Sequence, residues 1–110
     1  MTIENDLIMK SKQLVQQMQD AERQNKPIDK IVNQHINLLE EFHDVFVKKA
    51  DRENYAPLDK VSGEVKIYSN MKVLAKKIGL PVEEYDKKIF ELRCKIFSPD
   101  AVKQLFHDEG

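Results

Sequence analysis

Hydrophobic residues recur along the chain at alternating spacings of three and four, which is the period of an amphipathic α-helix. In the first segment the apolar or small positions are Ile3, Leu7, Ser11, Leu14, Met18 and Ala21. The other positions of this segment are mostly amides and charges, which indicate a solvated helix face. Thr2 is a candidate N-cap at its start, and the pattern ends at Asn25-Lys26-Pro27 because proline disfavours helical backbone in the residue before it.

A second helix is predicted from about Ile28 to Ala50. Its stripe at three and four spacing comprises Ile28, Ile31, Val32, His35, Leu38, Leu39, Phe42, Val45, Phe46 and Lys49. Because the connection to the first helix is short, the two form an antiparallel αα-hairpin. Each helix is about 33 Å long at 1.5 Å per residue. We therefore expect the hairpin to bury part of its stripe against the rest of the chain or against a second copy.

The segment from Asp51 to Leu58 has no period and is predicted to be a loop, and Asp59 is predicted to cap a third helix. That helix is expected to end at Gly79, in a left-handed conformation, with Pro81 preventing its continuation. A fourth helix is predicted over Pro81 to Phe97. Ser98 then caps a short fifth helix that starts at Pro99.

These elements predict an all-α fold in a single domain, residues 1–110. It comprises a long antiparallel hairpin (1–50), a loop (51–58) and two to three shorter helices (59–110) with a tight corner at 79–81, which together form a small bundle. No segment alternates polar and apolar residues as a half-buried strand does.

Composition narrows the classes of function. The 110 residues carry a formal net charge of −1, so no overall basic field attracts nucleic acid or an anionic membrane. The 3 glycines lie far apart, which excludes glycine-rich phosphate loops. The single cysteine, Cys94, and the lack of an apparent signal peptide or transmembrane segment predict a cytoplasmic or otherwise intracellular protein.

The stretch from Leu74 to Tyr85 resembles the core of a helix-turn-helix. A recognition helix places basic or amide side chains at its N-terminus against bases and phosphates. Here that position holds Glu83, Glu84 and Asp86, which a polyanion would repel. We therefore interpret residues 74–92 as a helical corner and keep a DNA-binding regulator as the alternative function.

Two histidines are candidates for chemistry. Glu40 and His43 have the Glu-x-x-His spacing of di-iron bundles, but such sites need two copies of the motif and two further glutamates. We interpret this pair as a solvated helix flank, and no metal site is predicted. His35 lies within the apolar stripe and is predicted to be a neutral, hydrogen-bonded histidine of the core or of an interface, whose protonation would loosen its surroundings.

No catalytic residue or cofactor is predicted. Cys94 lies inside a helix with no histidine near it in sequence, and it is interpreted as a partly buried small hydrophobe. The serines and the threonine stand in no nucleophile-elbow context. Enzymatic activity is therefore not expected.

The remaining interpretation is a protein–protein interaction module, a small helical regulator, adaptor or inhibitor that forms a homodimer and binds a partner protein. An apolar stripe broader than the chain can cover favours this class. The hairpin is expected to carry self-association, and Tyr55 to Pro57 and the later helices are expected to meet the partner. The predicted partner or self-association surface comprises Leu7, Leu14, Met18, His35, Phe42, Phe46, Tyr55, Tyr68 and Tyr85.

Overall fold

The computed structural model describes residues 3–106 of the chain. Its helices are α1 (Ile3–Arg23), α2 (Asp29–Arg52), α3 (Pro57–Lys77), α4 (Glu83–Arg93) and α5 (Pro99–Phe106). No strand occurs within these residues, which confirms the all-α fold class. The predicted N-cap Thr2 lies outside them.

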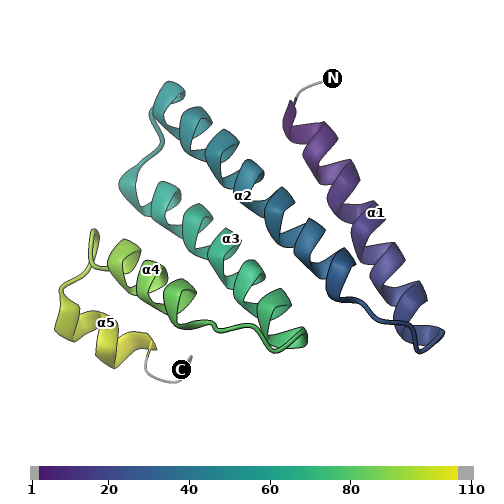
Figure 1. Cartoon of the computed structure of the whole chain (residues 1–110). Coiled ribbons are helices and arrows are strands. Elements are labelled where there is room, and N and C mark those ends of the chain that lie inside the picture. The colour runs from purple at the N-terminus through teal and green to yellow at the C-terminus, as the bar shows by residue number, and fades with distance from the viewer. Residues whose placement is uncertain (1–2, 107–110) are drawn as a thin grey trace.

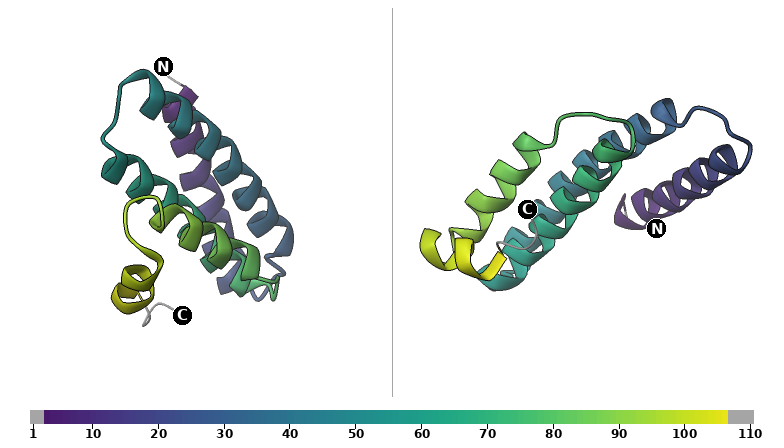
Figure 2. Two further views of the ribbon diagram at one scale, coloured as in Figure 1. Left: turned by 90° about the vertical axis from the view of Figure 1, so that its left-hand side faces the viewer. Right: turned by 90° about the horizontal axis from the view of Figure 1, so that it is seen from below.

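From α1 to α4, successive helices lie side by side and alternate in direction, so these four helices form a single layer (Figures 1 and 2). Extensive contacts join α1 to α2, α2 to α3, and α3 to α4. The Cα trace measures 46 × 36 × 16 Å, and its radius of gyration is 15.5 Å. A compact domain of about 100 residues has roughly 13 Å. The layer is therefore flattened, and α1 is an end helix whose extensive packing is with α2 alone.

The elements after α2 are not all short. The third helix, α3, has 21 residues, as many as α1. The prediction that only shorter helices follow the hairpin is wrong for α3. The reason is that the regular stripe of α3 packs on α2 along one side and on α4 along another, so both flanks of a long helix have partners.

Each long helix ends in one residue of left-handed conformation, namely Asn25 (φ 55°), Asn54 (φ 53°) or Gly79 (φ 73°). The N–H of the following residue then donates to the carbonyl five residues before it, over 2.8 or 2.9 Å, in the pairs Lys26–Ala21, Tyr55–Ala50 and Leu80–Ala75. These bonds satisfy carbonyls that the end of a helix leaves without a partner. The prediction for Gly79 is confirmed, and asparagine, which tolerates the same backbone, provides the other two turns.

Several predicted boundaries are wrong, among them the start of the fourth helix, which is Glu83 and not Pro81. The second helix continues to Arg52 and the third begins at Pro57, so the predicted loop 51–58 shrinks to residues 53–56. Proline is favourable at the first helical position because its fixed φ suits the helix and its missing N–H needs no partner. Ala56 is therefore the N-cap, and Asp59 lies in the first turn. The fourth helix ends at Arg93, before Phe97, where the backbone tightens into bonds spanning three residues.

The core is shared by the first three helices. It comprises Met18, Val32, Ile36, Leu39, Ile67, Met71, Leu74 and Ala75, and Val32 and Met71 are its largest fully buried side chains. Tyr68 and Tyr85 pack against this cluster from α3 and α4. The buried stripe of α2 therefore packs within the chain, on α3, while α1 covers its other side.

Candidate functional site

A groove of about 440 Å³ lies between α3 and the C-terminal segment. Its floor is apolar, and Leu58 at its rim is 57% exposed. Lys66 and Arg93 are the charged residues of the lining, and both are cations. The complete lining is Leu58, Val61, Ser62, Val65, Lys66, Ser69, Arg93, Ile96, Phe97 and Phe106. We call this the α3–α5 groove.

Local interactions hold α5 beside this groove. The hydroxyl of Ser98 accepts a hydrogen bond from the N–H of Ala101 over 3.2 Å, as predicted for a cap. Val102 is the buried anchor of the helix. The Arg93 guanidinium stacks 3.7 Å above the ring centroid of Phe106, whose ring also lies 6.1 Å from that of Phe97. A cation over an aromatic face is attracted by the ring quadrupole, so Arg93 is held at the edge of the groove.

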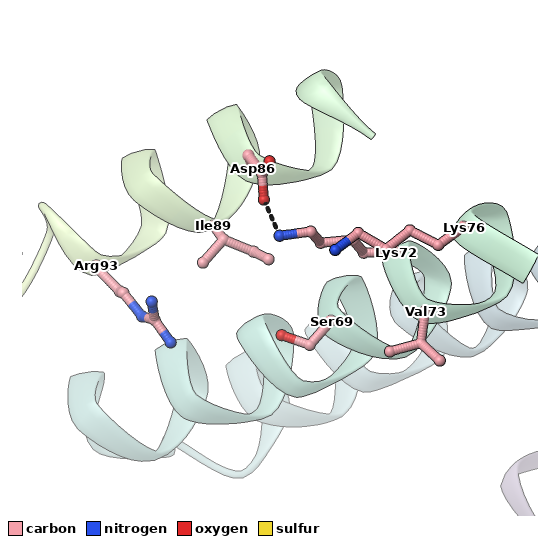
Figure 3. A pocket seen from close by; sticks show the side chains of 7 residues that line it. All are labelled: Ser69, Lys72, Val73, Lys76, Asp86, Ile89 and Arg93. Atoms are coloured by element: carbon pink, nitrogen blue, oxygen red, sulfur yellow. Dashed lines mark ion pairs between the residues drawn. The ribbon is translucent and has the colours of Figure 1, made fainter. Parts of the chain in front are cut away.

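A second groove, of about 350 Å³, separates α3 from α4 (Figure 3). Lys72 and Lys76 extend from α3 toward α4, and Arg93 reaches back from α4. The Nζ of Lys72 lies 2.5 Å from the carboxylate of Asp86. Because this ion pair spans the groove and neutralises Lys72, the lining offers less cationic charge to a ligand than its composition indicates.

The seam between α1 and α2 contains His35. Its Nε2 lies 2.8 Å from the Ser11 hydroxyl, and the residue is only 8% exposed. Burial lowers the pKa of His35 below its ordinary value of 6.5, because the charged imidazolium loses hydration. The predicted hydrogen bond of His35 is confirmed, and the structure shows that the residue is buried between α1 and α2.

An apolar groove of about 300 Å³ opens along the same two helices. Apart from Ser11 and Lys12, every residue in its lining is apolar, and Ile8 at its edge is 41% exposed. The apolar members are Leu7, Ile8, Leu38, Leu39 and Phe42. We call this the α1–α2 groove. Among the described helices, α1 packs extensively only against α2. No other helix therefore covers the face on which this groove opens.

The seam between α2 and α3 contains an interaction that the sequence did not indicate. The His43 Nε2 lies 2.9 Å from a carboxylate oxygen of Glu64, which is only 7% exposed. The ring of Tyr68 lies 5.0 Å from that of His43. Burial, and after it the carboxylates of Glu64, Asp44 and Glu40, raise the pKa of Tyr68, so its hydroxyl stays neutral.

The interpretation of Glu40 and His43 as a solvated helix flank is correct for Glu40, which is exposed, and wrong for His43, which is half-buried and pairs with Glu64. Glu40 is exposed one turn before His43, whereas Glu64 approaches from the neighbouring helix. Within residues 3–106, no three His, Cys, Asp or Glu side chains are grouped to hold a metal ion. Among these residues, His43 therefore has a single carboxylate partner, Glu64 of the neighbouring helix, and not the set of carboxylates and histidines that a di-iron site needs.

The residues of the predicted interaction surface do not form one patch. Three of them are buried, namely Leu7, Met18 and His35, and six are half-buried, namely Leu14, Phe42, Phe46, Tyr55, Tyr68 and Tyr85. The structure brings Leu7 and Phe42 together in the α1–α2 groove and packs Phe46 edge-on against Tyr55. Sequence reasoning missed Leu58 because it was placed in the predicted loop 51–58, whereas the structure has it in α3. It missed Ile8 because an exposed apolar residue of a helix can follow the same period as a buried one.

The corner at 79–81 leads α4 back alongside α3 (Figures 1 and 2). The helices of a helix-turn-helix cross at about 90–120°. This antiparallel arrangement is a helical hairpin, and Asp86 is turned toward Lys72 of α3. The geometry gives the DNA-binding alternative no support.

Cys94 caps the C-terminal end of α4 and is half-buried, away from the start of any helix. None of the described helices has the length and apolar character needed to cross a bilayer. Comparison of the chain with protein-family models, curated proteins and solved structures finds no match.

Proposed function

We propose that this protein is a non-enzymatic protein–protein interaction module, an intracellular regulator, adaptor or inhibitor that acts by occupying the surface of a partner. The observation that carries the proposal is the α3–α5 groove. It combines an apolar floor with two cations and has no carboxylate, histidine or cysteine in its lining. Such a lining suits recognition of a polypeptide better than acid–base or nucleophilic chemistry.

The chemistry of the groove indicates what it binds. An apolar floor takes the hydrophobic face of a helix, whose anchors recur at three and four spacing. Lys66, which is exposed, and Arg93 favour carboxylates at the edge of that face. The expected occupant is therefore an amphipathic segment of another protein that has acidic residues beside its apolar stripe.

The first two helices serve a second role in this proposal, which is self-association. The α1–α2 groove is apolar. The first helix, α1, lies at the opposite end of the layer from α5 (Figure 1). A dimer formed there leaves both α3–α5 grooves accessible. The proposal thus assigns self-association and partner binding to different faces.

Capture from lysate with matched variants tests the proposal. Leu58 and Val73 are both on α3 and are 57% and 56% exposed, but only Leu58 lines the α3–α5 groove. A true partner should copurify in near-equal amount with the native chain and with Val73→Lys, and be lost with Leu58→Lys. Circular dichroism should confirm that both variants fold.

Two results would contradict this function. One is capture of the same proteins by Leu58→Lys and by the native chain. The other is recovery of nucleic acid with its bound proteins, all removed by nuclease. The second result, with duplex binding that falls steeply as salt rises, would favour the DNA-binding regulator.

A further inference from the structure

The face of α1 that borders the α1–α2 groove has a symmetric arrangement of charge. Glu4, Ile8 and Lys12 are spaced by four residues, which places them on one stripe of the helix. At 1.5 Å per residue, Glu4 lies about 6 Å before Ile8 along the axis and Lys12 about 6 Å after it. The stripe therefore has a carboxylate at one end, an apolar centre and an ammonium at the other end.

A stripe of this kind is complementary to itself. When two copies of α1 cross antiparallel with their Ile8 side chains on a two-fold axis, Glu4 of each chain meets Lys12 of the other. Two-fold contacts are isologous, so the same patch appears on both sides and every favourable pair occurs twice. A parallel arrangement would instead place like charges together.

We infer that the chain forms a two-fold homodimer in which α1 helices cross antiparallel at Ile8, with reciprocal Glu4–Lys12 ion pairs between the chains. The inference rests on the self-association included in the proposed function and specifies its register. The occupant of the α1–α2 groove is then the second copy, whose Ile8 packs against Ile8 of the first chain at the edge of the groove. Ile8 is 41% exposed in the single chain, and its burial in the dimer, next to the half-buried Phe42, supplies the apolar part of the contact.

Two features of the single chain favour this contact. The carboxylate of Glu4 is already held by Lys49 of α2 at 3.2 Å, which orders it at the edge of the face. An ionised carboxylate has further acceptor sites, so it can bind Lys12 of the second copy as well. The end position of α1 in the layer leaves this face open to approach (Figure 1).

Charge reversal with complementation tests the register. Either Glu4→Lys or Lys12→Glu alone makes both inter-chain pairs repulsive in a homodimer, which should raise the dimer dissociation constant about tenfold or more. In an equimolar mixture of the two variants, each position-4 to position-12 contact again joins a cation to a carboxylate. The mixture should therefore dimerise as heterodimers nearly as tightly as the native chain.

The measurement is sedimentation velocity over a concentration series of the full chain, with circular dichroism to confirm folding of each variant. Lys10→Glu is the matched control, because it reverses the same charge on α1 but lies about 160° around the helix from Lys12. Its dimerisation should match that of the native chain. Ile8→Lys, which places two charges on the axis, should be monomeric.

The register is wrong if the mixture of variants stays monomeric while each variant is folded, or if the single reversals dimerise like the native chain. It is also wrong if the native chain is monomeric throughout the series. These failures are separable from failure of the proposed function. In each case, loss of the captured partner on Leu58→Lys but not on Val73→Lys would still support an interaction module.

Discussion

Gly63 of α3 lies directly against the ring of Phe46 of α2. A Cβ atom at position 63 would stand 2.7 Å from Cε1 and 2.8 Å from Cε2 of Phe46, closer than real Cβ atoms approach other atoms. The ring has limited room to withdraw, because Tyr55 packs edge-on against it with the centroids 6.0 Å apart. The close approach of α2 and α3 at this level therefore depends on the missing side chain.

We predict that Gly63→Ala destabilises the protein. In an open helix interior this change stabilises by about 1 kcal/mol, because alanine is the better helix former. Here the added methyl group must displace an aromatic ring, and overpacking of this kind costs roughly 1–3 kcal/mol. The free energy of unfolding, measured by urea titration of the helical circular dichroism signal, should fall. Ser62→Ala, at the exposed neighbouring position, should change it by less than about 0.5 kcal/mol.

A double-mutant cycle identifies the cause. Phe46→Leu removes the ring edge that meets the added methyl group, so Gly63→Ala should cost less in the Phe46→Leu background than in the native one. A stabilised Gly63→Ala variant, or strictly additive effects, would contradict the proposed contact.

Much of the fold follows from local sequence. Helical period predicted the existence of the helices, and the Gly79 and Ser98 termini followed from backbone preferences that neighbouring residues alone determine. The start of α3 at Pro57 was missed because Asp59 was preferred as a cap over proline at the first helical position. The end of α2 at Arg52 was missed because residues 51–58 show no hydrophobic period. A glycine inside a helical pattern, as at position 63, is itself a signal of close packing.

The sites depend on tertiary contacts and were less accessible from sequence. The pairing of His43 with Glu64 joins residues 21 positions apart on different helices, which no helical spacing encodes. The α3–α5 groove likewise depends on how α5 is placed beside α3. The stripe pattern identified apolar positions such as Leu7 and Phe42 without showing that they line a groove rather than fill the core.

The pair of His43 and Glu64 should contribute to stability. We predict that Glu64→Ala lowers the free energy of unfolding by about 1–3 kcal/mol, because it leaves a half-buried imidazole without its partner. Glu64→Gln retains a group that can hydrogen-bond to the imidazole and should lose less. Thermal and urea unfolding of both variants measure the difference.

The control for this prediction is Glu40→Ala. Glu40 is the carboxylate that helical spacing pairs with His43, yet it is exposed. Its removal should change stability by less than about 0.5 kcal/mol. A loss equal to that of Glu64→Ala would show that the inter-helix pair is not the stabilising one.

His35 should make stability depend on pH. Its pKa is lowered in the folded chain, so the unfolded chain binds the proton more strongly. Stability from this group is complete above the unfolded value of 6.5 and is lost as the pH falls below it toward the lowered pKa. The native chain should therefore lose more stability between about pH 7.5 and about pH 5.5 than His35→Gln does.

Urea unfolding of the native chain and of His35→Gln at both pH values gives the loss of stability of each. Subtracting one loss from the other cancels the contributions of the carboxylates, which the two proteins share. Ser11→Ala provides the comparison, because it removes the hydrogen bond to His35 and leaves the imidazole in place. It should lower stability at both pH values, with the acid-sensitive part retained. Equal losses in the native chain and His35→Gln would rule out His35 as the sensitive group.

The contact of Arg93 with Phe106 should control how firmly α5 is held. Phe106→Ala removes the ring, and with it both the stacking contact with the Arg93 guanidinium at 3.7 Å and the neighbouring contact with Phe97. We expect faster amide hydrogen exchange over residues 99–106, since a cation over an aromatic ring contributes about 0.5–1 kcal/mol at such sites. Exchange in α1 and α2 should be unchanged, because extensive contacts join only neighbouring helices of the layer. Local opening of α5 therefore leaves the packing of α1 and α2 intact. Leu105→Ala, at a residue 63% exposed on the same helix, should leave exchange at the native rate. If Leu105→Ala accelerates exchange as much as Phe106→Ala does, the stacked pair is not what anchors α5.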